Sequence, residues 1–171
     1  MKPRQARHPE SEVAARWSAM RMIERRPHAV REVVTKLTRK GYEPPAIEAA
    51  VERLKEQGLL DDEKFAAAFV RSRIARKPTG RRLISMQLTA HGVDRAVAAA
   101  ATAGAATGEA ERAVDAARRY LRRKPFKYAG QRNLDAAKER SRLIGWLLRQ
   151  GFDSDAARKA LAIAGVPEEE D

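Results

Sequence analysis

Hydrophobic positions follow a helical period along most of the chain. Apolar side chains recur at i, i+3, i+4 and i+7 from Val30 to Leu37, and the same spacing returns from Ile47 to Leu54. This spacing places apolar groups on one stripe of a helix and leaves polar groups on the other faces. No segment shows the sustained alternation that is typical of strands, so we predict an all-α protein. The further stripes comprise Val13, Trp17, Met20 and Ile23; Phe65, Ala68 and Phe69; Ile84 and Leu88; Val114, Ala117 and Leu121; Leu143, Ile144, Leu147 and Leu148; and Ala157, Ala160, Leu161 and Ala164.

Prolines and glycines mark the ends of the predicted helices. A proline clashes with the helical turn before it but fits the first turn, and a glycine adopts the left-handed conformation that commonly ends a helix. Carboxylate and hydroxyl side chains can accept hydrogen bonds from the free amides that open the next helix. The predicted stop positions are Gly41, Gly58, Gly92 and Gly151, and the predicted capping residues are Asp61 or Asp62, Thr79, Thr107 and Asp153.

The same pattern of a proline and a later glycine occurs three times. A basic residue and a proline precede a helix that ends in Leu-x-x-x-Gly followed by an apolar residue. The proline and the glycine are 14 residues apart in the first two copies and 26 apart in the third, which therefore contains an insertion of 12 residues around 126–137. The three copies are Pro27 to Gly41, Pro78 to Gly92 and Pro125 to Gly151.

The repetition predicts three tandem three-helix repeats. One such repeat has too little apolar surface to fold well alone, so neighbouring repeats must stack. Stacking in a row predicts an elongated, curved body. The predicted organisation is an N-terminal extension at 1–10, helical repeats at 11–60, 61–106 and 107–165, and an acidic tail at 166–171.

The composition adds a strongly basic character. Lys and Arg number 35 against 23 Asp and Glu, which gives a formal charge of +12 and a pI near 10.6. Such a surface favours polyanions, or proteins that hold polyanions. The absence of cysteine excludes disulfides, thiol nucleophiles and Cys-ligated metal sites. The longest apolar run, 96–101, is far short of the ~20 residues of a membrane helix, so we expect a cytoplasmic protein with no membrane partner.

Two windows carry basic residues and no acidic ones. Residues 64–93 contain seven Lys or Arg, and residues 116–134 contain seven more. Because like charges repel, this pattern indicates a surface that faces an anionic partner; solvated helix faces are the alternative, since arginine is a good helix former. Four of the arginines, from Arg118 to Arg123, are predicted to share one helix face. The predicted partner-binding residues are Arg71, Arg73, Arg76, Lys77, Arg81, Arg82, Arg118, Arg119, Arg122 and Arg123.

Aromatic residues are sparse in the basic windows. The second window offers Tyr120, Phe126 and Tyr128, so contact with a phosphate backbone is favoured over base stacking. Trp17 and Trp146 lie on helical stripes and are predicted as core anchors, with an outward-facing Trp146 as the alternative.

No pattern points to catalysis, a cofactor or a metal. Asp61 and Asp62 are adjacent carboxylates at a helix start, where they act as caps that balance the helix dipole. His8, His28 and His91 are scattered at no ligand spacing and are expected at the surface or at caps. The chain has no Gly-x-x-x-x-Gly-Lys loop for nucleotide phosphates. We therefore predict a protein that is not an enzyme and binds no cofactor.

A longer motif occupies the centre of the chain. A Leu-Asp-Asp-x-x-Phe-Ala stretch at 60–66 is followed by an arginine-ended helix and then by Gly-x-x-x-Ile-x-x-x-Leu-x-x-x-Gly at 80–92. This arrangement resembles the RecX family, whose members regulate the RecA recombinase. The family often has a hydroxyl residue where this chain has Ala29. The matching positions are Leu60, Asp61, Asp62, Phe65, Ala66, Arg73, Gly80, Ile84, Leu88 and Gly92.

The resemblance implies a body of nine helices in three repeats that lies in the groove of a RecA filament on single-stranded DNA. It also implies contact with successive RecA protomers and inhibition of ATP hydrolysis, strand exchange and co-protease activity. We therefore predict a monomeric regulator of the RecA filament in recombination, DNA repair and the SOS response, with single-stranded DNA as a further candidate partner.

Two other functions are left open by the residues. A DNA-binding regulator of the helix-turn-helix type could use residues 30–54, although the turn contains Pro44 and Pro45 and the helix after it is acidic, which is wrong for a major-groove reader. A helical adaptor without a nucleic-acid role would bind its partner with little salt dependence, whereas a groove binder loses affinity steeply as salt rises.

Overall fold

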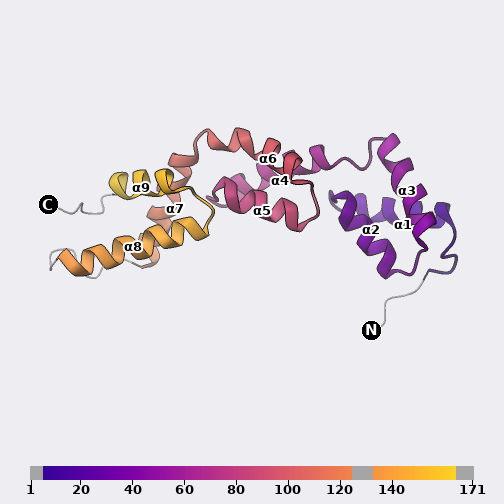
Figure 1. Cartoon of the computed structure of the whole chain (residues 1–171), viewed down its shortest axis with the longest axis horizontal. Helices are drawn as coiled ribbons and strands as arrows, with labels where there is room; N and C mark the ends of the chain where they lie inside the picture. Colours follow the sequence, from indigo (N-terminus) through magenta and orange to yellow (C-terminus); the bar gives the residue numbers. More distant parts are fainter. Residues whose placement is uncertain (1–5, 125–132, 165–171) are drawn as a thin grey trace. The chain divides into compact units, whose positions relative to one another are not determined.

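Helices account for all the regular structure that is described. The computed structural model describes residues 6–124 and 133–164, which contain nine α-helices, one short 3-10 helix and no strand (Figure 1). The predicted all-α class is therefore confirmed. The helices are α1 (Glu12–Ile23), α2 (Val30–Arg39), α3 (Pro44–Glu56), α4 (Asp62–Arg76), α5 (Arg81–Ala90), α6 (Arg95–Ala103), η1 (Gly104–Ala106), α7 (Glu109–Arg123), α8 (Asn133–Arg149) and α9 (Ser154–Ile163).

The described residues form two compact units. Unit 1 comprises residues 6–68 and 88–98, and unit 2 comprises residues 69–87, 99–124 and 133–164. Helices α1, α2 and α3 belong to unit 1, and α7, α8 and α9 belong to unit 2, whereas α4, α5 and α6 each contribute residues to both.

The core of unit 1 lies between α1, α2 and α3. The stripe predicted from Ile47 to Leu54 is buried, and it packs with Val33 and Leu37 of α2. The prediction of Trp17 as a core anchor is wrong, because its side chain is 57% exposed. Small residues on the other faces of α1, such as Ala15 and Ala19, enter the core instead, which lets α1 approach α3 closely.

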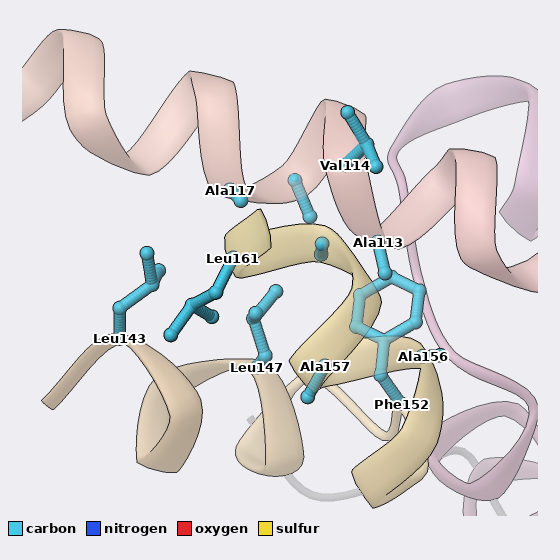
Figure 2. Close-up of a cluster of buried hydrophobic side chains, with 11 residues drawn as sticks. Ala113, Val114, Ala117, Leu143, Leu147, Phe152, Ala156, Ala157 and Leu161 are labelled. Carbon is cyan, nitrogen blue, oxygen red and sulfur yellow. The ribbon is translucent and has the colours of Figure 1, made fainter. Parts of the chain in front are cut away.

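The core of unit 2 is formed by α7, α8 and α9. Figure 2 shows Leu143 and Leu147 of α8 pointing toward Leu161 of α9, with alanines of α7 and α9 filling the space between the helices. Phe152, just before α9, is fully buried in the same cluster. The stripes predicted for these three helices enter this cluster at positions such as Val114, Leu147 and Leu161, whereas Leu148, predicted on the same stripe of α8, is exposed.

Two of the predicted glycine stops also permit a close approach of the backbone. Gly92 has a φ of 91°, and a Cβ atom there would lie 2.4 Å from the Cβ of Arg31. Gly151 has a φ of 86°, and a Cβ atom there would lie 2.3 Å from the backbone nitrogen of Leu83. Both the left-handed conformation and the contact therefore require glycine at these positions.

Each unit uses a carboxylate from a later helix to cap an earlier one. The amide of Val30, which opens α2, donates to Oδ1 of Asp62 at 2.9 Å, and the amide of Arg81, which opens α5, donates to Oε1 of Glu109 at 3.0 Å. Asp62 thus supplies the cap that Ala29 cannot provide. Thr79 was predicted to cap α5, but its hydroxyl donates to the carbonyl of Lys77.

Local caps agree with the sequence more closely. Oδ1 of Asp61 accepts a hydrogen bond from the amide of Lys64 at 2.9 Å, and Oδ1 of Asp153 accepts one from the amide of Ala156 at 2.8 Å. The residue before α7 is Gly108 with a φ of 71°, so the predicted cap at Thr107 does not form there. The residue bounds of the three repeats stay a prediction, and the acidic tail lies outside the described residues.

Candidate anion-binding site

All ten predicted binding residues belong to unit 2, and five of them line one groove. This cationic groove has a volume of about 810 Å³ and is formed by the end of α4, the C-terminal half of α7, and α8. Its wall combines basic and aromatic side chains. The lining residues are Arg76, Lys77, Pro78, Ala116, Arg119, Tyr120, Arg122, Arg123, Lys124 and Trp146.

The cationic groove brings the two basic windows together. Arg76 ends α4 and Lys77 follows it, whereas the other cations come from α7 and from Lys124 directly after it. Residues at 119, 122 and 123 have the i, i+3 and i+4 spacing that places side chains on one helix face. Parts of the two basic windows thus meet in one groove, which the sequence did not predict.

The six cations of the groove are not neutralised within unit 2. No carboxylate lines the groove, and across the described ranges 6–124 and 133–164 none of the six has a carboxylate within ion-pair distance. Lys77 is held by a neutral partner, since its Nζ donates to Oε1 of Gln150 at 2.8 Å. Clustered charges of one sign in a concave wall focus the electric field and attract a counter-charged ligand.

An aromatic pair lies in the same wall. The rings of Tyr120 on α7 and Trp146 on α8 have centroids 4.9 Å apart and an interplanar angle of 44°. Both side chains line the groove and are half-buried. The sequence did not reveal this pair, because Tyr120 and Trp146 come from different helices. Phe126 and Tyr128 of the second window lie outside the described residues.

Arg81 is engaged inside unit 2. Its Nε lies 3.1 Å from Oε2 of Glu109, and one terminal nitrogen lies 3.4 Å from Oδ2 of Asp153. A backbone hydrogen bond from Ala156, together with the Arg81 guanidinium, lowers the pKa of Asp153 below its ordinary value. Arg81 therefore joins the start of α5 to α7 and to the start of α9, and it is a weaker candidate for partner binding than the sequence indicated.

The other four predicted residues lie away from the groove. Arg82 is exposed and, with Ser85 and Thr102, lines a smaller hollow of about 450 Å³. Arg71, Arg73 and Arg118 are exposed on α4 and α7 but line neither of these two hollows. The guanidinium carbon of Arg73 lies 5.4 Å from the centroid of the Phe69 ring, within the range of a cation–π contact.

Unit 1 shows the opposite electrostatic arrangement around Glu32. Arg26 donates to both carboxylate oxygens, and Nζ of Lys36 lies 2.9 Å from Oε1. Partial burial raises the pKa of Glu32, but the hydrogen bonds from Arg26 and Lys36 outweigh it and lower the pKa to about 2. Both cations therefore form ion pairs with a carboxylate of their own unit.

His28 lies beside this cluster and is buried, so its prediction as a surface or cap residue is wrong. Nδ1 donates to the carbonyl of Arg26 at 2.8 Å, and Nε2 lies 2.7 Å from Nζ of Lys36. Burial lowers the pKa of His28 below 6.5 and favours the neutral imidazole. With the proton on Nδ1, Nε2 of the neutral imidazole can accept a hydrogen bond from the ammonium group of Lys36.

The described part of the chain offers neither a cluster of metal-binding side chains nor a membrane-spanning helix. No group of three His, Asp or Glu side chains there could hold a metal ion. None of the helices in these ranges is both long enough and apolar enough to cross a lipid bilayer.

Comparisons with known proteins give one consistent result. Residues 15–54 match the model of the first three-helix domain of RecX, and residues 61–101 match the model of the second. A protein of Mycobacterium sp. (strain KMS) named regulatory protein RecX is 32% identical over 163 residues, which cover 95% of this chain and 87% of that protein. A namesake from Xanthomonas oryzae pv. oryzae (strain MAFF 311018) is 36% identical over 142 residues, 83% of each chain.

A solved structure supports the same fold. The crystal structure of RecX from Lactobacillus salivarius superimposes with a TM-score of 0.77 over 90% of this chain and 96% of that chain, at 19% sequence identity. The fold, the two matched domains and the relatives that match nearly the whole chain agree with the motif at residues 60–92. This chain belongs to the RecX family of regulatory proteins.

Proposed function

We propose that the protein binds the RecA filament on single-stranded DNA and mainly inhibits its ATPase, strand-exchange and co-protease activities. Membership of the RecX family supports a regulatory role of this kind. The proposal places its action in the cytoplasm, during recombination and DNA repair, as a monomer that performs no chemistry of its own.

The observation that carries the proposal is the cationic groove. A filament of protein and nucleic acid presents phosphates and carboxylates, and arginine guanidinium groups bind both through paired hydrogen bonds. Four of the six cations of the groove are arginines that supply such groups from α4 and α7. Binding across neighbouring RecA protomers would then oppose the rearrangements that accompany ATP turnover.

The predicted binding residues are retained in this proposal with unequal weight. Arg76, Lys77, Arg119, Arg122 and Arg123 are the first candidates, because they line the groove. Arg82 follows as an exposed residue of the smaller hollow. The exposed residues Arg71, Arg73 and Arg118 come next, and the internally paired Arg81 comes last.

The helix-turn-helix alternative is less well supported. The helix that would enter the major groove is α3, and it begins with two prolines and carries three glutamates, Glu48, Glu52 and Glu56. Glutamates repel the phosphates that line the groove edges. Binding of this protein to duplex DNA alone, with a sequence preference and without RecA, would favour the alternative.

The test is a titration of RecA-catalysed ATP hydrolysis on single-stranded DNA with the full chain. We expect inhibition at stoichiometric or lower ratios to RecA. The double variant Arg119→Gln/Arg122→Gln should inhibit less, and the matched variant Arg25→Gln/Arg95→Gln, which removes two exposed arginines of unit 1, should inhibit as the parent does. No inhibition by the parent protein at equal concentration would refute the proposed function.

A further inference from the structure

The aromatic pair of the cationic groove has no role in the proposal above. Trp146 and Tyr120 are half-buried: they pack against the edge of the core of α7, α8 and α9, and they also line the groove beside six cations. A groove built only to attract charge would need no indole. The combination of an electropositive wall with half-exposed aromatic side chains is the pattern by which proteins hold unpaired nucleotides.

We propose that the cationic groove is a binding site for single-stranded nucleic acid, in which phosphates lie along Arg119, Arg122 and Arg123 and an unpaired base stacks on Trp146. The inference rests on the proposed function in that it names the nucleic-acid strand as the component that this groove contacts. It also differs from the prediction made from the sequence, which favoured contact with the phosphate backbone alone because aromatic residues are sparse in the basic windows.

The cations are arranged to follow a chain of phosphates. Arg119 and Arg123 are one helical turn apart, a rise of about 6 Å along α7, and Arg76 and Lys77 face the same groove from α4. A strand in the groove therefore meets cations on more than one side. The hydrogen bond from Lys77 to Gln150 fixes one of these cations near the end of α8.

The aromatic faces select for unpaired bases. In a duplex the faces of the bases are covered by their neighbours, so an indole in a groove wall can stack only on a base that has left the helix. An acidic peptide would satisfy the cations but would leave Trp146 and Tyr120 without a flat partner. The tilt of 44° between the two rings leaves their faces on different planes, so they do not cover each other completely.

The experiment uses the fluorescence of Trp146 in the full chain. The only other tryptophan is Trp17, which is exposed on α1 in unit 1, so Trp17→Phe gives a parent in which Trp146 is the sole reporter. This parent is titrated with an oligothymidylate and with an abasic oligonucleotide of the same length and the same number of phosphates. No RecA is present, so the result does not depend on the filament.

Stacking predicts a difference between these two probes. The oligothymidylate should change the Trp146 emission and bind about 5- to 150-fold more tightly than the abasic strand, which is the range expected for one stacked base. In the same parent, Trp146→Leu should bring the affinities of the two probes together. Circular dichroism shows whether the Trp146→Leu variant folds. If it does not fold, the difference between the two probes on the folded parent tests the stacking by itself.

The cations should affect both probes equally. Arg119→Gln/Arg122→Gln should weaken binding of either probe and reduce the slope of log affinity against log salt by about 1.4, since each phosphate contact on a single strand contributes about 0.7. The matched control Arg25→Gln/Arg95→Gln should leave both the affinity and the slope unchanged.

Other outcomes would overturn this inference or, separately, the proposed function. Equal affinity for the two probes with unchanged emission excludes stacking on Trp146, and equally tight binding of thymidine triphosphate indicates a mononucleotide site instead. If neither probe binds but RecA ATP hydrolysis is still inhibited, the groove contacts an acidic protein surface and the proposed function stands. If the probe binds as predicted but RecA is not inhibited, the site stands and the proposed function fails.

Discussion

Units 1 and 2 solve the same structural problem with different charges. The equal spacing of 14 positions from Pro27 to Gly41 and from Pro78 to Gly92 makes Arg26 equivalent to Lys77. In unit 1, Arg26 donates to Glu32, five residues after the proline. In unit 2 the residue at that position is Leu83; Lys77 has no carboxylate within ion-pair distance among the described residues, and it lines the cationic groove.

The comparison shows how little sequence change separates a structural cation from a binding cation. Both units cap the helix that follows the proline with a carboxylate from a later helix, and both need a glycine where a later loop approaches. The scaffold is therefore shared. One acidic residue decides whether the neighbouring cation is neutralised inside the protein or is left to attract a partner.

The largest expected effect is charge reversal in the groove. Arg119→Glu/Arg122→Glu removes two attractions and adds two repulsions, and each lost phosphate contact weakens binding about fivefold near 0.1 M salt. We expect the concentration for half-inhibition of RecA ATP hydrolysis to rise about 100-fold. Arg25→Glu/Arg95→Glu in unit 1 should change it by less than about twofold. Equal effects of the two double variants would contradict a special role of the groove.

The next effect concerns the buried cap of unit 2. Glu109→Ala removes the acceptor of the Arg81 amide and leaves the Arg81 guanidinium with Asp153 alone, so we expect a loss of about 2 kcal/mol in unfolding free energy. Asp62→Ala in unit 1 removes a cap without an ion pair and should cost about 1 kcal/mol. Urea denaturation followed by circular dichroism measures both.

Glu111→Ala is the control for the Glu109 variant. Glu111 lies in the same first turn of α7 but is exposed, so its removal should change the unfolding free energy by less than about 0.5 kcal/mol. Similar losses for Glu109→Ala and Glu111→Ala would show that helix charge, and not the contact with Arg81, sets the stability.

A smaller effect depends on pH. Because the folded pKa of Glu32 is about 2 and its ordinary value is 4.5, its contribution to stability is complete above about pH 5 and is lost as pH falls toward 2. We expect Glu32→Gln to lower the unfolding free energy by about 1 to 2 kcal/mol at pH 6, a figure reduced because Arg26 is half-exposed. Urea denaturation should show this gap closing near pH 2. A gap that stays constant from pH 6 to pH 2 would contradict the assignment.

The smallest effect concerns the two tryptophans. Trp17 is exposed on α1, so Trp17→Ser should change the unfolding free energy by less than about 0.5 kcal/mol. Trp146 packs partly against the core of unit 2, so Trp146→Ser should cost clearly more in the same denaturation experiment. A large loss for Trp17→Ser would restore the role that the sequence stripe indicated.

Local patterns predicted the helices and their ends well. Apolar spacing identified the buried positions of α2, α3, α8 and α9, because a helix repeats every 3.6 residues whatever it packs against. The helix ends at Gly92 and Gly151 could be predicted because few residues other than glycine adopt the left-handed conformation found there. The RecX motif at residues 60–92 also identified the family correctly.

Contacts between distant segments could not be read from the sequence. The large side chains of α1 suggested a core that includes Trp17, but close packing of α1 on α3 selected alanines instead. The capping role of Glu109 and the stacking of Tyr120 with Trp146 depend on which helices meet, and no local spacing records that. For the same reason, the sequence could not show which arginines would line the groove together.

The most direct test of the account is the salt dependence of binding to the filament. A fluorescently labelled full chain is titrated with preassembled RecA filaments on single-stranded DNA at several salt concentrations, and its anisotropy is measured. We predict that affinity falls steeply as salt rises, and that Arg119→Gln/Arg122→Gln flattens this dependence while Arg25→Gln/Arg95→Gln does not. An affinity that is independent of salt, or a slope that the groove variant leaves unchanged, would contradict the claim that the unneutralised cations of unit 2 hold the partner.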